Sequence, residues 1–131
     1  MAKTSSGRSP KRSRVPAAIL ATVDAVRSKK AADVLALDLK EAGAFTDYFV
    51  VCTGQNRRQV QAIADAVEIA LKAKKLRPSH VEGYERGEWV LLDYFDFVVH
   101  VFSPNARMFY SLERLWGNAR TLALPEPSPA A

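Results

Sequence analysis

Apolar and polar residues follow one another along this chain in patterns that predict three helices and five strands. The predicted order is helix, two strands, helix, three strands, helix. Helices separated by groups of strands indicate a mixed sheet with helices packed on it. We therefore expect one α/β domain with a five-stranded mixed sheet flanked by helices.

In the first half of the chain, apolar spacings of three and four predict a helix over residues 16–30. Residues 33–39 alternate between apolar and polar and predict a strand. The continuous apolar run 48–53 is typical of a central strand buried on both faces. A helix over residues 57–75 follows, and Asn56 is its expected N-cap.

In the second half, residues 80–84 and 88–93 predict a hairpin, and a strand over residues 96–102 is expected to pair antiparallel with the preceding one. Ser103 is the expected N-cap of the last helix, with Pro104 at its first position. The core face of this helix is predicted from apolar residues at helical spacing, namely Phe109, Leu112, Trp116 and Ala119.

The positive charge of the chain is concentrated at one end. Residues 1–14 hold five of the 19 Lys and Arg residues and no acid, so the other 14 are balanced by the 14 Asp and Glu. The remainder lacks the net positive charge that is typical of a nucleic-acid-binding domain. We expect residues 1–14 to form a disordered basic tail, and a basic arm that contacts RNA phosphates is the alternative.

Composition also indicates the domain boundaries and the cellular compartment of the protein. The proline-rich end of the chain predicts a flexible C-terminal tail over residues 121–131, which leaves a domain over residues 15–120. The single cysteine, Cys52, cannot form an internal disulfide, and a cytoplasmic location in a reducing cytosol is the simplest expectation. No run approaches the roughly 18 uncharged apolar residues of a membrane helix.

No catalytic residue, metal site or cofactor is predicted, although two arrangements of residues resemble parts of such sites. Thr53-Gly54 lies between a strand and a helix and could hold an anion, but an ordinary tight turn is favoured because no phosphate-binding motif surrounds it. Asp93 and Asp96 could hold a metal ion, but residues three apart do not share a strand face, which favours a turn-capping role. A mid-strand histidine such as His100 is usually structural.

The remaining anomaly is a group of aromatic side chains near the strand ends. Trp89 and Leu91 are expected on one face of their strand, with Val90 and Leu92 on the other, so both faces are apolar. One face can pack on a helix, and the other requires either a second helix or a partner. Exposed aromatics surrounded by carboxylates are typical of an interface core with a polar rim.

Six segments of the chain, taken in order, resemble the ribosomal silencing factor family, also called the Iojap-related family. The resemblance covers residues 17–120 and rests on the segments DYFVVCTG (47–54), RQVQAIAD (58–65), VEG (81–83), WVLLD (89–93), DFVVHVF (96–102) and RMFYSLERLW (107–116). One departure is Phe95, because many relatives have glycine between the two acidic positions.

The resemblance implies a nucleotidyltransferase-like fold without the catalytic apparatus, and a translational repressor rather than an enzyme. It implies binding to the large ribosomal subunit through ribosomal protein fourteen, which blocks joining of the small subunit when nutrients are scarce. It also implies a homodimer when free. We expect the partner to contact eight residues, namely Trp89, Leu91, Asp93, Tyr94, Phe95, Asp96, Tyr110 and Glu113. An enzyme that acts on a nucleotide or an RNA end is the alternative.

Overall fold

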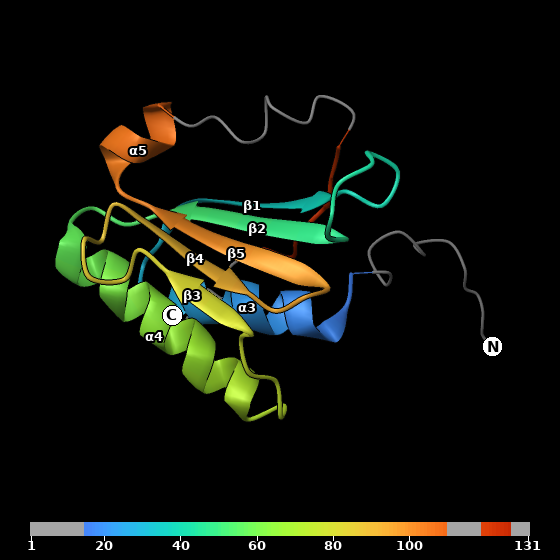
Figure 1. Cartoon of the computed structure of the whole chain (residues 1–131), viewed down its shortest axis with the longest axis horizontal. Coiled ribbons are helices and arrows are strands. Elements are labelled where there is room, and N and C mark those ends of the chain that lie inside the picture. Colours follow the sequence, from blue (N-terminus) through green and yellow to red (C-terminus); the bar gives the residue numbers. More distant parts are fainter. Residues whose placement is uncertain (1–14, 110–118, 127–131) are drawn as a thin grey trace.

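The computed structural model describes residues 15–109 and 119–126, which form a mixed sheet with helices on it (Figure 1). The helices and strands follow one another in the order α3 (Ala17–Ser28), β1 (Ala32–Asp38), β2 (Tyr48–Thr53), α4 (Arg57–Lys72), β3 (His80–Glu82), β4 (Trp89–Asp93), β5 (Phe97–Phe102), α5 (Pro104–Phe109) and β6 (Arg120–Thr121).

The sheet has the strand order β3-β4-β5-β2-β1-β6. Its two central strands, β2 and β5, are parallel, and every other neighbouring pair is antiparallel. The α4 crossover carries the chain from β2 to β3 at the far edge, from which β4 and β5 return toward the centre. Both central strands are apolar almost throughout, as expected for strands covered on both faces.

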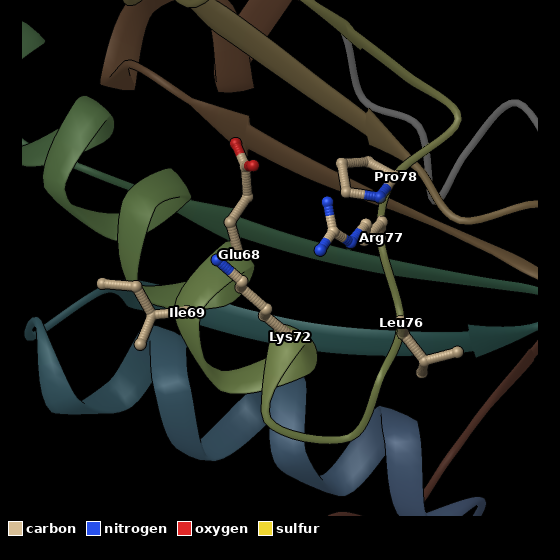
Figure 2. Close-up of a pocket in the computed structure, with 6 residues that line it drawn as sticks. All are labelled: Glu68, Ile69, Lys72, Leu76, Arg77 and Pro78. Carbon is tan, nitrogen blue, oxygen red and sulfur yellow. The ribbon is translucent and has the colours of Figure 1, made fainter.

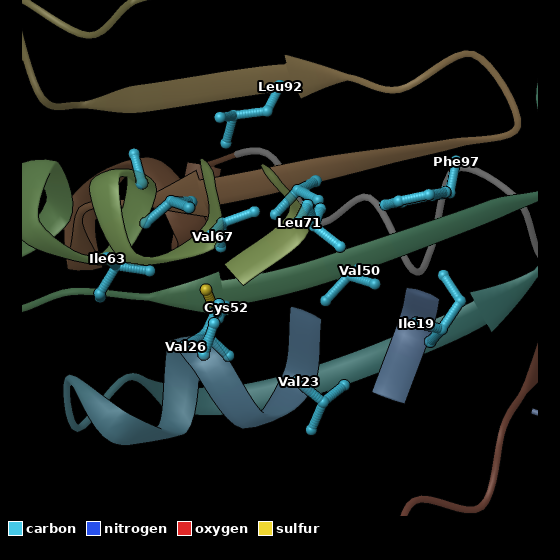
Figure 3. Close-up of a cluster of buried hydrophobic side chains, with 14 of the residues drawn as sticks. Ile19, Val23, Val26, Val50, Cys52, Ile63, Val67, Leu71, Leu92 and Phe97 are labelled. Carbon is cyan, nitrogen blue, oxygen red and sulfur yellow. The ribbon is translucent and has the colours of Figure 1, made fainter. Parts of the chain in front are cut away.

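Helices α3 and α4 lie together on one face of the sheet, whereas α5 lies on the other side, beyond the end of β5 (Figure 1). The larger core cluster fills the space between the sheet and these two helices (Figure 3). Its buried members come from both helices and from the strands, and include Ile19, Val23, Val26, Val50, Ile63, Val67, Leu71 and Leu92.

A smaller cluster, which we call the second-face cluster, lies on the opposite face of the sheet. Its buried members are Leu37, Leu39, Phe49, Val51, Val98 and Phe102. Partly buried side chains pack against it, among them Leu35, Trp89, Leu91, Ala106 and Ala119. The sheet therefore has an apolar surface on both sides, as the sequence predicted for the strand that carries Trp89.

Local signals for helix ends are confirmed. The side chain of Asn56 accepts a hydrogen bond from the Gln59 amide at 2.9 Å and caps α4. The hydroxyl of Ser103 accepts a hydrogen bond from the Ala106 amide at 3.2 Å, and Pro104 begins α5.

Two sequence predictions about the C-terminal region are wrong. The sheet has six strands rather than five, because Arg120–Thr121 pairs with β1. The expected flexible tail also does not begin at residue 121. Leu122 donates its amide to the Ala36 carbonyl at 2.8 Å, and Leu122 and Leu124 pack against the larger core cluster. Two residues of strand are too short to give a periodic signal, so the pairing could not be read from the pattern.

Candidate partner-binding surface

Strand β4 divides its side chains between the two faces of the sheet, as the alternation in its sequence predicts. Val90 and Leu92 are fully buried on the side of α3 and α4. Trp89 and Leu91 are half-buried and pack against the second-face cluster. The two residues expected at the centre of a docking surface therefore lie side by side on the face opposite α3 and α4, and both retain exposed area.

Trp89 is anchored within this face rather than standing free in solvent. Its indole Nε1 donates a hydrogen bond to Nδ1 of His100 at 3.0 Å. Its ring centroid lies 5.1 Å from that of Phe102 and 5.9 Å from that of His100. The indole thus contributes to folding as well as to the surface, which the sequence did not indicate.

Two glycines shape the chain that leads into Trp89. Gly83 has φ +80°, and a Cβ at this position would lie 2.0 Å from the carbonyl oxygen of Trp89. Gly87 has φ +65°, and its missing side chain leaves room for the side chain of Arg57. The close approach of Gly83 to the start of β4 fixes where the strand and its tryptophan begin.

The turn between β4 and β5 carries the next three predicted residues. One Asp93 carboxylate oxygen accepts a hydrogen bond from the Phe95 amide at 2.8 Å, which is the turn-capping role favoured from the sequence. Phe95 is 79% exposed and has φ +74°, an unfavourable backbone conformation for a residue with a side chain. Asp96 is exposed beside it. The turn therefore presents a phenyl ring next to a carboxylate.

Tyr94 must be corrected as a contact residue. It is buried with the larger core cluster and stacks on Phe97 with ring centroids 5.0 Å apart. Burial, together with the charge of Glu68, raises the pKa of Tyr94 to about 12, so its hydroxyl stays protonated. The alternation of β4 continues through this residue, which places it on the same face as Val90 and Leu92.

Sequence reasoning missed Phe45, which is 75% exposed. Its neighbour Thr46 donates its hydroxyl to the Phe95 carbonyl at 2.9 Å, and the Asp47 amide donates to the Asp96 carbonyl at 3.0 Å. The loop before β2 and the β4–β5 turn are therefore joined, and each carries an exposed phenylalanine. The sequence signal that could have identified Phe45 is an aromatic residue within a loop that is otherwise largely polar.

The remaining predicted contacts, Tyr110 and Glu113, lie outside the described residues. The nearby start of α5 is fixed to the sheet, because Nη1 of Arg107 donates to the hydroxyl oxygen of Thr53 at 2.9 Å. This bond ties α5 to the carboxyl end of β2.

The backbone amides at the Thr53-Gly54 turn donate their hydrogen bonds to groups of the chain itself. The amides of Gln55 and Gln59 donate to the side chains of Gln59 and Asn56, and the Gly54 amide donates to the Phe102 carbonyl at 2.8 Å. A Cβ at Gly54 would lie 2.9 Å from Val60 Cγ2, so the glycine permits close helix packing. These bonds support the interpretation of an ordinary tight turn over that of an anion site.

Burial makes two titratable side chains of the central strands, Cys52 and His100, poorly suited to catalysis. Burial raises the pKa of the Cys52 thiol to about 12, so little thiolate exists at neutral pH. Burial lowers the pKa of His100 to about 3. Within residues 15–109 and 119–126, no three His, Cys, Asp or Glu side chains lie close enough together to hold a metal ion.

A hollow of about 450 Å³ lies at the C-terminal end of α4 (Figure 2). Charged side chains of both signs extend into it beside apolar ones, and the lining residues are Glu68, Ile69, Lys72, Leu76, Arg77 and Pro78. None of these residues is a serine, threonine, cysteine or histidine, and the hollow lies away from the surface around Trp89.

In the same described ranges, no helix is both long and apolar enough to cross a membrane.

Comparison with known proteins gives one consistent result. The family model described as "Ribosomal silencing factor during starvation" matches residues 12–131. The chain is 43% identical over 102 residues to the ribosomal silencing factor RsfS of Halalkalibacterium halodurans, covering 78% of this chain and 87% of the relative. It is 42% identical over 91 residues to RsfS of Bacillus subtilis, covering 70% and 77%.

A crystal structure of a Chromobacterium violaceum protein superimposes with a TM-score of 0.71 and 36% identity, covering 84% of this chain and 87% of that one. The fold, the motifs and the family match agree over the same part of the chain. The chain therefore belongs to the ribosomal silencing factor family.

Proposed function

We propose that this protein binds the large ribosomal subunit through ribosomal protein fourteen and sterically blocks joining of the small subunit. The family supports a ribosome-associated role in silencing translation. A mouse relative, 29% identical over 97 residues, is named "Mitochondrial assembly of ribosomal large subunit protein 1". The large subunit is accordingly the partner that we assign, and nutrient limitation is the condition in which the repression operates.

The observation that carries the proposal is the partly buried pair Trp89 and Leu91 on the sheet face opposite α3 and α4. An apolar patch anchored by tryptophan is typical of the energetic centre of a protein interface. Phe95 extends this patch at the turn, and Phe45 adds a ring on the adjoining loop. Tyr110 remains part of the proposed contact set, whereas Tyr94 is withdrawn because it is buried.

Charge at the edge of the patch favours a basic partner. Asp93 and Asp96 lie on the turn next to the aromatic residues, and Glu113 is proposed as a third acidic contact. Carboxylates at an interface rim accelerate and orient encounter with a positively charged protein. Ribosomal proteins bind RNA and are commonly basic, which suits this arrangement.

The two other partner assignments remain proposals. The basic segment 1–14 makes a weak, salt-sensitive contact with ribosomal RNA, and the free protein is a homodimer in the cytoplasm. Deletion of residues 1–14 tests the first of these proposals, because each lost phosphate contact reduces the slope of log affinity against log salt by about one. Sedimentation equilibrium of the free protein tests the second.

The decisive experiment uses purified large and small subunits on sucrose gradients. We expect added protein to sediment with large subunits and to reduce the fraction of joined ribosomes. A Lys72→Ala variant is the matched control, because this exposed residue lies at the hollow of α4, away from the proposed surface. Unchanged joining in the presence of saturating protein would refute the proposed function.

A further inference from the structure

His100 occupies the centre of the sheet, where a polar side chain is least expected. It lies in β5 opposite Val51 of β2 and Leu91 of β4, and only 3% of it is exposed. Its ring packs edge-on against Phe49, with centroids 4.4 Å apart, and parallel to Phe102 at 6.1 Å. The imidazole is thus held in place by aromatic neighbours within the second-face cluster.

The protonation state of this ring follows from its one hydrogen bond. An indole N–H can only donate, so Nδ1 of His100 must be the acceptor for Nε1 of Trp89 at 3.0 Å. Burial holds the imidazole neutral at physiological pH, which assigns its proton to Nε2. Nε2 is buried and has no hydrogen-bond partner among the described residues.

Packing alone does not account for a histidine at this position. A buried N–H without an acceptor is destabilising, and a leucine of similar volume would fill the space without that penalty. What the histidine adds is the acceptor for Nε1 of Trp89 at 3.0 Å, and this hydrogen bond restricts the orientation of the indole.

We propose that His100 is a positioning residue for the partner-binding surface, and that its Nδ1 atom holds the Trp89 indole in the orientation that the partner recognises. The inference rests on the proposed function, because it treats Trp89 as the anchor. A side chain that is already ordered loses less conformational freedom on binding, which strengthens association. The contacts with Phe49 and Phe102 keep the imidazole itself from rotating away.

The first test follows the indole directly, without any partner. In a 15N NMR spectrum of the full chain, the Nε1–H signal of Trp89 is assigned by its loss in Trp89→Phe. We expect His100→Leu to shift this signal and to speed its exchange with solvent by about tenfold, the factor that corresponds to one net hydrogen bond. His100→Asn, whose side-chain oxygen can replace Nδ1 as acceptor, should restore slow exchange. Unchanged exchange in His100→Leu would overturn the proposal.

The second test measures affinity for purified large subunits by co-sedimentation. We expect His100→Leu to weaken binding about tenfold while the melting temperature stays equal or rises, and His100→Asn to recover part of the loss. In the Trp89→Phe background, which lacks the N–H, His100→Leu should have no further effect. An equal loss in both backgrounds would show a structural role and refute the positioning role. If the parent protein itself does not bind, the proposed function fails, and the NMR test alone decides the positioning role.

Discussion

The missing side chain of Gly83 leaves the space that the carbonyl oxygen of Trp89 occupies. A Cβ there would lie only 2.0 Å from that oxygen, and the backbone has φ +80°. Gly83→Ala should therefore displace the start of β4 and lower the free energy of unfolding by more than the roughly 1–2 kcal/mol of a left-handed residue alone. Chemical denaturation measures this loss.

Gly43 provides the control for that prediction. It has φ +77°, but a Cβ at this position would meet no atom within 4 Å. Gly43→Ala should therefore show only the backbone penalty of a left-handed residue, about 1–2 kcal/mol. Equal losses at both positions would mean that β4 can shift freely, and that Gly83 does not fix the position of Trp89.

Phe95→Gly should weaken binding without lowering the stability of the fold. The phenyl ring is 79% exposed and its backbone has φ +74°, so glycine relieves strain and removes little packing. We expect stability to stay equal or to rise by up to about 1 kcal/mol, since greater freedom of glycine in the unfolded chain offsets part of the gain. Binding to large subunits should weaken if the ring contacts the partner. Parent-like binding would remove Phe95 from the interface.

Trp89→Ala should abolish binding to large subunits and also lower stability. The sequence alone suggested an exposed anchor with little effect on melting, but the indole packs on Phe102 and bonds to His100. Because the side chain is only half-buried, we expect a loss of about 2 kcal/mol, below the range for core tryptophans. Trp89→Phe keeps most of the packing and separates the two effects. Binding by Trp89→Ala at parent strength would exclude this residue as the anchor.

Mild acid should destabilise the fold through His100. Burial lowers its pKa from 6.5 to about 3, so below pH 6.5 the unfolded chain binds a proton that the folded chain does not. Stability is complete above pH 6.5 and falls by about 1.4 kcal/mol per pH unit down to about pH 3. Urea titrations at pH 7 and pH 5 should differ by about 2 kcal/mol. In His100→Leu the corresponding difference should disappear, and its persistence would assign the effect to other groups.

Truncation after Ala119 should destabilise the domain, whereas truncation after Glu126 should not. The longer deletion removes β6 and the packing of Leu122 and Leu124, and it leaves the buried carboxylate of Asp38 without the Arg120 guanidinium 3.0 Å away. We expect a loss of about 2–3 kcal/mol, in which the ion pair has a minor part because its Arg120 side chain is exposed. Equal melting temperatures for the two truncations would contradict this packing.

Sequence patterns located most of the fold because local chemistry and tertiary structure agree at those positions. Asn56 and Ser103 each cap a helix with the hydrogen bond that their residue types favour. The continuous apolar run of β2 predicted burial on both faces, and β2 is indeed a central strand. The pairing of Arg120–Thr121 with β1 depends on contacts between segments far apart in the sequence, and a segment of two residues is too short to show a strand pattern.

The candidate surface was predicted less completely, for a related reason. Alternation assigned Trp89 and Leu91 correctly to one face, and its continuation to Tyr94 would have indicated burial. Phe45 became relevant only when the structure joined its loop to the turn at Phe95. Periodicity determines which face of a strand a residue occupies, but it does not show which loops lie together.

The parallel pairing of β2 with β5 has a consequence for the synthesis of this chain. Three elements, α4, β3 and β4, are translated between these two neighbours, so β2 has an unpaired edge until β5 emerges. At about 5–20 residues per second, that interval lasts roughly 2–10 s. During it, the apolar side chains of Val50, Val51 and Cys52 lack their final neighbours, and the nascent chain is most prone to aggregate. A factor that we propose to act on ribosomes is thus most vulnerable while still attached to one.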